Sequence, residues 1–460
     1  MKFEILRRNI IIGLIVIISI CISGVIKSKY QTSKNISLTN EKTNYDINKI
    51  DTIAIYTQNK DNYDKIDVIP NTGYVFDNEK SYCTINGEEE QNITINYDNN
   101  SQSLSIAPLT TKDTKCYLYF RYPHTIPELI ESKIIDQRAD FNSTLTSNTT
   151  GTLFKTEDDD GISYYFAGAV DDNYVKFGGY YWRIIRINGN GSMRMIYQGK
   201  TQDAKGKDSV INESVAFNIF STELRDNAYV GYMYGTVKSN NYEEAHANTN
   251  DSNIKKVVDE WYKDNLLSYA TYIDKNSGFC GDREISSGLG YGTNETDYAA
   301  YDRLFAHLEK KPTLKCSNPN RDLYTVSEAN NGNRALTYPI GLITADEISY
   351  AGGIWNDDEN KYNYSFYLYI GEIAYWTMTP HRYTSGGWAG SCLLGGAGHL
   401  SATGSQNAHG VRPVINLKPE VTFKGAGTLT DPYTIVWIND SKQINQKRSY
   451  ILFKLYYIKE

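Results

Sequence analysis

An uncharged apolar segment near the start of the chain sets the strongest limit on how this protein folds. Residues Asn9 to Ile26 read NIIIGLIVIISICISGVI, eighteen residues without a charged side chain. A helix needs about 20 apolar residues to cross the hydrocarbon core of a bilayer. A cleavable signal peptide has a shorter apolar stretch and an A-x-A-like cleavage site, and neither is present. The segment predicts a signal anchor at 9–26, after a cytoplasmic N-terminus at 1–8.

The cysteines favour an extracytoplasmic location for the rest of the chain. Cys83 and Cys116 are 33 residues apart, Cys280 and Cys316 are 36 apart, and there is no C-x-x-C motif. Each pair falls inside one candidate domain, and local disulfides are typical of oxidising compartments. The alternative is four buried, reduced thiols. Basic residues flank the apolar segment on both sides, so the positive-inside rule does not decide the orientation.

Composition excludes some classes of protein. The hydrophobic fraction is 40% and the charged fraction 22%, which is typical of a globular chain rather than a disordered one. The net charge is −7 and Lys and Arg form no runs, so nucleic acid is not an expected partner. Thirty-nine tyrosines favour β-rich structure, because aromatic side chains fit a pleated, half-buried surface.

Sequence patterns divide the remainder into five parts. Residues 27–48 are polar and lack apolar periodicity, which predicts a flexible stalk. Short alternating strands between Asn, Asp and Gly clusters predict a small, Ig-like β-sandwich at 49–122. The capping box from Thr125 to Glu128 predicts a short helix in a linker at 123–150. A larger domain follows at 151–436, and the tail at 437–460 is interpreted as strand or disorder.

The larger domain shows strands, then helices, then strands. Alternating segments on both sides of Gly189–Gly191 predict a hairpin. Ile254, Val257, Val258 and Trp261 recur at helical spacing, and Thr344 with Glu347 forms another capping box. Strands are expected again in YNYSFYLYIG, AYWTMTP, GVRPVINL and DPYTIVWI. This order predicts an α+β domain.

Ordered motifs in 151–436 resemble those of membrane-anchored surface proteins of gut-type Gram-positive bacteria. The motifs are YYFAGAVDDNYVKFGGYYWRIIRI, FCGDRE, LKCSNPNRDLYTV, ALTYPIGLITADEISYAGG, YWTMTP, GVRPVINL and GTLTDPYTI. The resemblance implies the C-type-lectin-like fold shared by formylglycine-generating enzymes and hypervariable receptor-binding proteins. It implies little about activity, because a fold does not carry its sites with it.

Arg412 stands among apolar residues and is followed by Pro413. In the resembling fold, the segments matching WTMTP and VRPV are strands beside a ligand-facing loop, which implies structural roles for Arg412 and Trp376. A buried guanidinium can bond carboxylates or several backbone carbonyls, and Pro413 removes a ladder donor. Asp346 and Glu347 are the candidate carboxylate partners.

Enzyme chemistry finds no support in the residues. The resembling formylglycine-generating enzymes use two closely spaced cysteines, but only Cys392 stands in the matching region. A related iron-dependent branch uses a His-x-x-x-His-x-Glu pattern that the six histidines do not provide. Cys392 could act with His381, His399 or His409 as base, but its apolar neighbours favour a small buried side chain. No catalytic residue and no cofactor are predicted.

Calcium is the one metal to consider. WNDDEN at Trp355–Asn360 offers several oxygen ligands of the kind that Ca²⁺ prefers. Its Trp-Asn-Asp is similar to the calcium motif of sugar-binding C-type lectins, which sits on the strand beside the sugar site. Here the segment follows the capped helix instead, and this position favours a solvated acidic turn.

The Gly-rich segment from Ser385 to Ala408 is the candidate ligand site. It contains an isolated Trp between small polar residues, and the resembling receptor-binding proteins bind with this segment. The alternative is a plain connecting hairpin. Aromatic anchors dominate binding energetics. The predicted ligand-binding residues are the anchor Trp388 and the polar contacts Ser391, His399, Ser401, Thr403 and Gln406.

The sequence therefore predicts a single-pass cell-membrane protein whose bulk lies outside the cytoplasm. Its expected function is ligand binding, as an adhesin or receptor that recognises an extracellular glycan or protein. A divergent enzyme of the formylglycine-generating type and a purely structural envelope protein are the alternatives.

Overall fold

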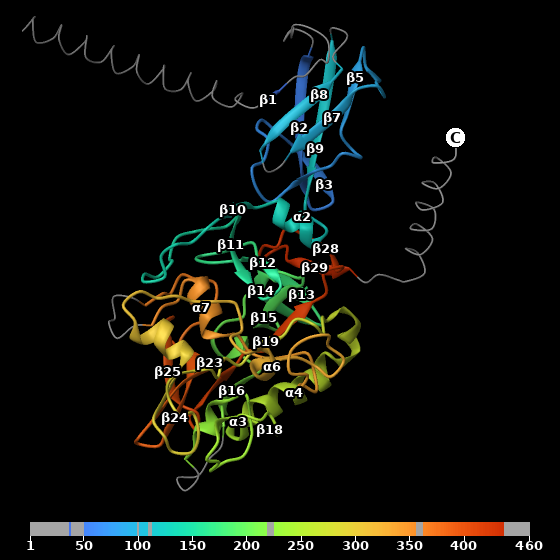
Figure 1. The fold of residues 1–460 in the computed structure, drawn as a ribbon. Coiled ribbons are helices and arrows are strands. Elements are labelled where there is room, and N and C mark those ends of the chain that lie inside the picture. The colour runs from blue at the N-terminus through green and yellow to red at the C-terminus, as the bar shows by residue number, and fades with distance from the viewer. Residues whose placement is uncertain are drawn as a thin grey trace, which may run out of the picture. The chain divides into compact units, whose positions relative to one another are not determined.

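The computed structural model describes residues 36–37, 50–98, 101–108, 113–218, 225–355 and 362–436. The chain divides into two compact units, Met1–Arg121 and Tyr122–Glu460 (Figure 1). The predicted anchor at 9–26, most of the stalk and the tail lie outside the described residues. Within the described ranges, no helix has the length and apolar character needed to cross a membrane.

The first unit is built from two sheets. Its smaller sheet has the order β1-β8-β7, and its larger sheet has the order β3-β2-β9-β5-β6, with β4 also on β9. The strands are β1 (Ile36–Ser37), β2 (Ile50–Asn59), β3 (Asn62–Ile66), β4 (Val75–Phe76), β5 (Tyr82–Ile85), β6 (Glu88–Glu89), β7 (Thr94–Asp98), β8 (Ser103–Ala107) and β9 (Thr114–Arg121).

Side chains from both sheets form one core in this unit. Leu118 and Phe120 on β9 pack with Leu104 and Ile106 on β8, and all four are buried. Alternate residues of a strand point to opposite faces, which is why every second residue of KCYLYF enters the core. The predicted disulfide between Cys83 and Cys116 is confirmed, and it joins directly opposed positions of β5 and β9.

The second unit contains a nine-stranded sheet that joins both ends of the domain. Its order is β10-β11-β12-β14-β13-β29-β28, and β15 pairs with β14 and β27. The strands are β10 (Ile134–Asp136), β11 (Thr152–Asp158), β12 (Gly161–Tyr165), β13 (Tyr174–Phe177), β14 (Tyr180–Ile187), β15 (Met193–Gly199), β27 (Val414–Leu417), β28 (Thr422–Lys424) and β29 (Tyr433–Val436).

A seven-stranded sheet forms the other large layer. It has the order β16-β26-β23-β21-β20, with β24 on β23 and β25 on β24. Its strands are β16 (Asn212–Ala216), β20 (Ile285–Gly288), β21 (Thr296–Tyr298), β23 (Tyr375–Thr384), β24 (Trp388–Leu394), β25 (Leu400–Gly404) and β26 (Ala408–Val411). Two small ribbons pair β17 (Met233–Tyr234) with β18 (Asn250–Asp251), and β19 (Phe279–Cys280) with β22 (Leu323–Tyr324).

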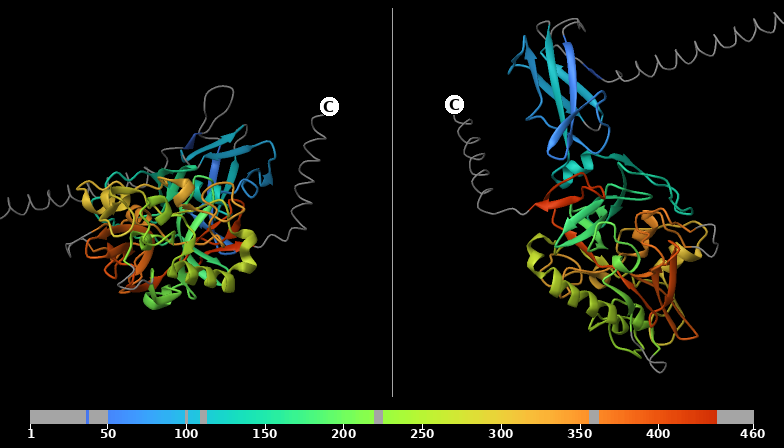
Figure 2. Two further views of the ribbon diagram at one scale, coloured as in Figure 1. Left: turned by 60° about the horizontal axis from the view of Figure 1, so that its bottom comes forward. Right: turned by 180° about the vertical axis from the view of Figure 1, so that it is seen from behind.

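Helices are few, and the predicted α+β class is wrong. Strands hold about 38% of the described residues and helices about 15%, so the described part is mostly β and an α+β C-type-lectin-like domain is not shown. The helices are α2 (Ile126–Glu131), α3 (Tyr242–Ala245), α4 (Asn253–Asn265), α5 (Ala299–Tyr301), α6 (Pro319–Asp322) and α7 (Ala345–Ala351). The longest, α4, lies on the outside of the second unit (Figure 2, yellow-green) and buries Ile254, Val258 and Tyr262.

The reason for this error lies in the segments around the predicted helices. Their Asn and Arg side chains bond to backbone carbonyl oxygens of segments far away in the sequence, so these segments are held without helical hydrogen bonds. Asn227 donates to the carbonyl oxygens of Gly292 and Asn294, and buried Arg283 donates to those of Met233 and His246. Side chains therefore hold these segments as ordered turns, and the helical periodicity of α4 and α7 does not extend beyond them.

The change from one large sheet to the other occurs at Arg412 and Pro413. Strand β26 of the seven-stranded sheet ends at Val411, and β27 of the nine-stranded sheet begins at Val414. Pro413 has no backbone N–H to give to a ladder, which suits this gap between two sheets. Its carbonyl oxygen still accepts from the backbone N–H of Tyr197 at 2.9 Å. GVRPVINL is thus two strands that belong to different sheets.

Candidate functional site

A tyrosine-lined groove opens on the second unit. It encloses about 1550 Å³, open solvent included. Its walls come from the loop before β13, the end of β15 with the loop after it, and the segment 364–371. The lining residues include Asp171, Tyr174, Arg183, Gln198, Asp203, Lys205, Tyr364, Tyr367 and Tyr369.

Aromatic side chains continue from this groove toward the Gly-rich hairpin. Tyr364 is 58% exposed, and its ring meets that of Tyr369 edge to face at 5.3 Å. Tyr362 lies 6.2 Å from Tyr364, and His399 stacks on Tyr362 at 4.9 Å. Contiguous exposed apolar side chains mark interaction sites, and aromatic rings offer contact area at low entropic cost. The row therefore gives the groove an aromatic rim.

Two buried polar side chains lie deeper in the groove. Arg183 and Tyr367 are 4% and 5% exposed. The Arg183 guanidinium lies 3.7 Å from the centroid of Tyr174 and 5.4 Å from that of Tyr367. Burial lowers the pKa of Arg183 to about 10 and raises that of Tyr367. At neutral pH the pair is one guanidinium cation and one neutral phenol.

Arg412 holds both walls of the groove together. It is fully buried and donates to the carbonyl oxygen of Tyr197 at 3.0 Å, that of Leu368 at 3.1 Å and Oε1 of Gln198 at 3.1 Å. Burial lowers its pKa. Asp346 and Glu347, the partners expected from the sequence, bind other arginines. Arg412 uses carbonyl oxygens because β15 and the segment 364–371, which carry its three acceptors, lie next to its position between the sheets.

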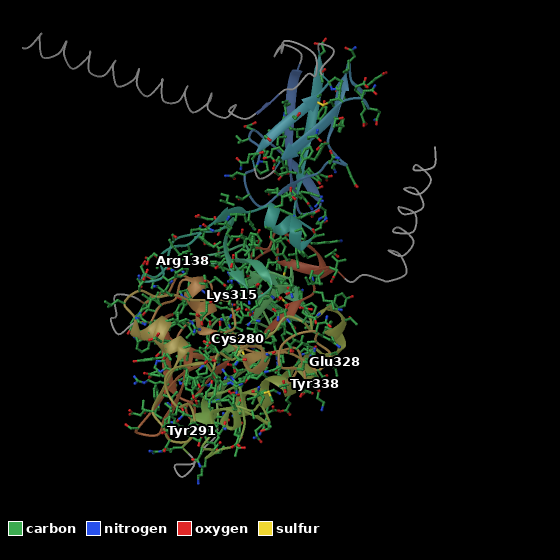
Figure 3. The ribbon with its side chains drawn as sticks, in the orientation of Figure 1. Arg138, Cys280, Tyr291, Lys315, Glu328 and Tyr338 are labelled. Atoms are coloured by element: carbon green, nitrogen blue, oxygen red, sulfur yellow. A yellow bond between two sulfur atoms is a disulfide. The ribbon has the colours of Figure 1, made fainter. Side chains whose placement is uncertain are left out.

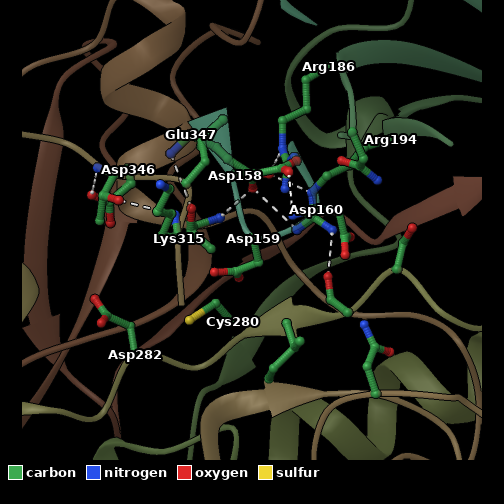
Figure 4. A pocket seen from close by; sticks show the side chains of 18 of the residues that line it. Asp158, Asp159, Asp160, Arg186, Arg194, Cys280, Asp282, Lys315, Asp346 and Glu347 are labelled. Carbon is green, nitrogen blue, oxygen red and sulfur yellow. Dashed lines mark hydrogen bonds and ion pairs between the residues drawn. The ribbon is translucent and has the colours of Figure 1, made fainter. Parts of the chain in front are cut away.

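A second hollow, a charged cleft, contains those two carboxylates (Figure 4). Glu347 accepts from Nε of Arg186 at 3.1 Å and from Nη2 of Arg194 at 3.3 Å, and its Oε1 lies 2.5 Å from Nε of Arg194 as an ion pair. Burial alone would raise the pKa of Glu347, but the Arg194 and Arg186 guanidinium groups outweigh it and hold the pKa below its ordinary value. The interaction ties α7 to strands β14 and β15.

The same cleft contains a second ion-pair cluster. Arg303 bridges Asp282 and Asp346, and burial raises the pKa of Asp282 to about 6. The disulfide between Cys280 and Cys316, predicted from the sequence, is confirmed, and Cys280 (labelled in Figure 3) lines the same cleft. No group of acidic, His or Cys side chains in the described ranges is arranged to hold a metal ion. Most of these charged side chains form ion pairs that join elements of the fold. Most of the acidic turn weighed for Ca²⁺ lies outside the described residues.

The six predicted ligand-binding residues do not form one cluster. Strands β24 and β25 make a hairpin in which Leu394 pairs with Leu400, so Trp388 and His399 lie at opposite ends. Ser391 is fully buried, with its hydroxyl 2.8 Å from that of Ser405, and is not available to a ligand. Ser401 and Thr403 are half-buried and Gln406 is exposed. Of the six, His399 is the one whose ring continues the aromatic row of the groove.

Trp388 instead packs beside a buried histidine. Its ring lies edge to face with that of His381 at 5.8 Å, and Tyr301 and Phe305 contact the same imidazole at 4.9 and 4.6 Å. Trp376, predicted as structural, is fully buried and donates to the carbonyl oxygen of Val215 at 2.7 Å. Cys392 is buried, its thiol pKa is raised by burial, and its nearest acceptor is the Pro380 carbonyl oxygen at 3.7 Å.

The sequence-based interpretation missed the groove residues. YNYSFYLYIG, residues 362–371, was expected to be a strand, but it contains no strand and forms bends and a turn. The four tyrosines of this segment stand at alternate or nearly alternate positions, which wrongly indicated a strand. The same tyrosines could have been interpreted as an aromatic surface. Arg183 carried no signal of its own because it lies in the alternating strand YYWRIIRI.

Comparisons with known proteins give no match to a family model, to a curated protein or to a solved structure.

Proposed function

We propose that this chain is a ligand-binding protein of the cell surface and that the groove of its second unit binds a glycan. The observation that carries the proposal is the aromatic rim formed by Tyr364 and Tyr369 above buried polar groups. Sugars present apolar C–H faces and many hydroxyl groups, so aromatic walls with a few fixed polar side chains suit them. Tyrosine supplies both kinds of contact in one side chain.

The location outside the cytoplasm is part of the same proposal. Two disulfides support it, because disulfides persist in oxidising compartments and are rare in reducing ones. The apolar segment at 9–26 supplies the proposed anchor. Protease added to intact cells is expected to digest both units and leave a short membrane stub. Full protection of the chain would contradict the proposed topology.

A glycan array probed with the detergent-solubilised full chain tests the binding function. Tyr364→Ala removes the most exposed ring of the rim and is expected to weaken binding by at least about tenfold, or about 1.4 kcal/mol. Tyr291→Ala is the matched control, since Tyr291 is partly exposed and lies outside the groove. Binding that is equally strong in wild type and Tyr364→Ala, or no glycan bound at all, would refute the proposal.

A further inference from the structure

Arg183 is a buried cation without a carboxylate partner in the described part of the chain. Its Nε donates to Oδ1 of Asn173 at 2.6 Å, and its Nη2 donates to the carbonyl oxygen of Val170 at 2.6 Å. No acceptor among the described residues engages Nη1. A buried charge is costly unless it is paired. Two carbonyl-type acceptors and the ring of Tyr174 offset this cost only in part.

The hydroxyl of Tyr367 is a second buried group in need of a partner. Its oxygen is buried and has no hydrogen-bond partner among the described residues, although the side chain lines the groove. A buried donor left unpaired costs about 1–3 kcal/mol. Such groups are rare in folded proteins, and each one calls for a physical explanation. Here a cation and a neutral O–H donor stand next to each other at the bottom of an open groove.

The charges on the rim do not neutralise this site. Asp171 and Asp203 are exposed, as is Lys205. Exposed charges are screened by water and salt, whereas a buried charge is screened much less. The rim carboxylates therefore leave the bottom of the groove electropositive.

We propose that the groove binds an acidic glycan and that Arg183 and Tyr367 bind its oxyanion, either a carboxylate or a phosphate group. The inference rests on the proposed glycan-binding function and names the ligand class of that site. An oxyanion accepts hydrogen bonds and carries the negative charge that would pair with the Arg183 cation. The planar guanidinium also matches the geometry of a carboxylate or phosphate group. The aromatic rim then contacts the sugar rings on either side of the acidic group.

Matched glycan pairs test the oxyanion directly. The full chain is titrated with sialyllactose, short hyaluronan and oligogalacturonate, each as the free acid and as its methyl ester, and with inorganic phosphate. At least one free acid is expected to bind about tenfold or more tightly than its ester, since a hydrogen bond to a charged group is stronger than one to a neutral group. Binding of phosphate alone would support the oxyanion site and identify phosphate as its source.

Two tyrosine variants separate recognition from folding. Tyr367→Phe removes an unpaired hydroxyl, so it is expected to keep or raise the Tm while it weakens binding of the acid and leaves binding of the ester unchanged. Tyr232→Phe is the matched control, because the Tyr232 hydroxyl is also buried without a partner but lies outside the groove. It should change neither affinity. Arg183→Gln should abolish the preference for acid over ester, with circular dichroism as the check on folding.

The outcomes distinguish this inference from the proposed function. Equal binding of acids and esters, with no binding of phosphate, would overturn the oxyanion site, and so would a Tyr367→Phe variant with unchanged preference. If esters and other neutral glycans bind and Tyr364→Ala weakens them, the glycan function stands without the acidic specificity. If no glycan binds but phosphate does, the glycan function fails and the oxyanion site stands. If neither a glycan nor phosphate binds, both proposals fail.

Discussion

Arg412 donates a hydrogen bond from Nη1 to the backbone carbonyl oxygen of Leu368 at 3.1 Å. Leu368 directly follows Tyr367, so this bond fixes the segment that carries the groove tyrosines. The hydroxyl of Tyr375 donates to the same carbonyl at 2.9 Å. The segment 364–371 has no ladder hydrogen bonds of its own, and these two side chains replace them. The position of the binding groove therefore depends on a residue that does not line it.

Replacing Arg412 with methionine should destabilise the second unit. The change keeps apolar bulk but takes a donor from three buried acceptors, of which the Leu368 carbonyl oxygen still has the Tyr375 hydroxyl. We expect a loss of about 3 kcal/mol or more in the free energy of unfolding. Urea denaturation followed by tryptophan fluorescence measures it. Arg382→Met is the control, since Arg382 pairs with Asp297 near the surface and such pairs contribute about 1 kcal/mol or less. Similar losses in both variants would contradict the role given to Arg412.

Removing the disulfide between Cys280 and Cys316 should lower stability by about 4 kcal/mol in the chain-entropy model, less any native strain. The double variant Cys280→Ser with Cys316→Ser is compared with wild type under oxidising conditions by thermal unfolding. Cys392→Ala serves as the control because Cys392 is unpaired. Its unfolding should respond to reductant as wild type does. Peptide mapping that finds Cys392 in a bridge would contradict the observed pairing.

His381 should make the protein sensitive to acid. Burial lowers its pKa to about 3, whereas an unfolded histidine has a pKa of about 6.5. The unfolded chain therefore binds more protons than the folded chain between these values, and stability falls as the pH falls from about 6.5 toward 3. At pH 4.5 this linkage is worth about 2–3 kcal/mol.

The variant His381→Phe removes the contribution of His381 protonation without adding a polar group. Its free energy of unfolding should therefore fall less than that of wild type between pH 6.5 and 4.5. Asp282 acts in the opposite direction, because burial raises its pKa to about 6 and the folded chain then binds the extra proton. Comparing the two proteins at each pH cancels the contribution of Asp282. Parallel stability curves for wild type and His381→Phe would show that His381 is not the group responsible.

Trp388 separates the structure-based site from the one expected from the sequence. Its half-buried ring packs on His381 and lies outside the groove, so Trp388→Ala should cost about 2 kcal/mol of stability, less than a fully buried Trp would. Glycan affinity should stay within about twofold of wild type. Calorimetric titration with the best array ligand decides between the sites. A large loss of affinity in a folded Trp388→Ala protein would show that the binding site lies on the hairpin around Trp388, as the sequence predicted.

Local sequence patterns were sufficient for elements whose hydrogen bonds are made within a few residues. Helix α4 was predicted from apolar spacing alone, and the capping box of Thr344 and Glu347 is present as expected. The hairpin of β14 and β15 and the two disulfides were also predicted. The fold class was not, because the predicted helices are present but short, and strands make up most of the regular structure of the described residues.

By itself, the sequence determined the strands, the caps and the pairing of cysteines, since each depends on periodicity or on separations of a few tens of residues. Only the tertiary structure decided that Arg183 and Tyr367 stand side by side, because 184 positions separate them in the numbering and no periodic pattern links them. The same holds for Arg412, whose three acceptors come from two distant segments. Burial and hydrogen-bond pairing are properties of the packed chain, and these determine which polar side chains are left facing a groove.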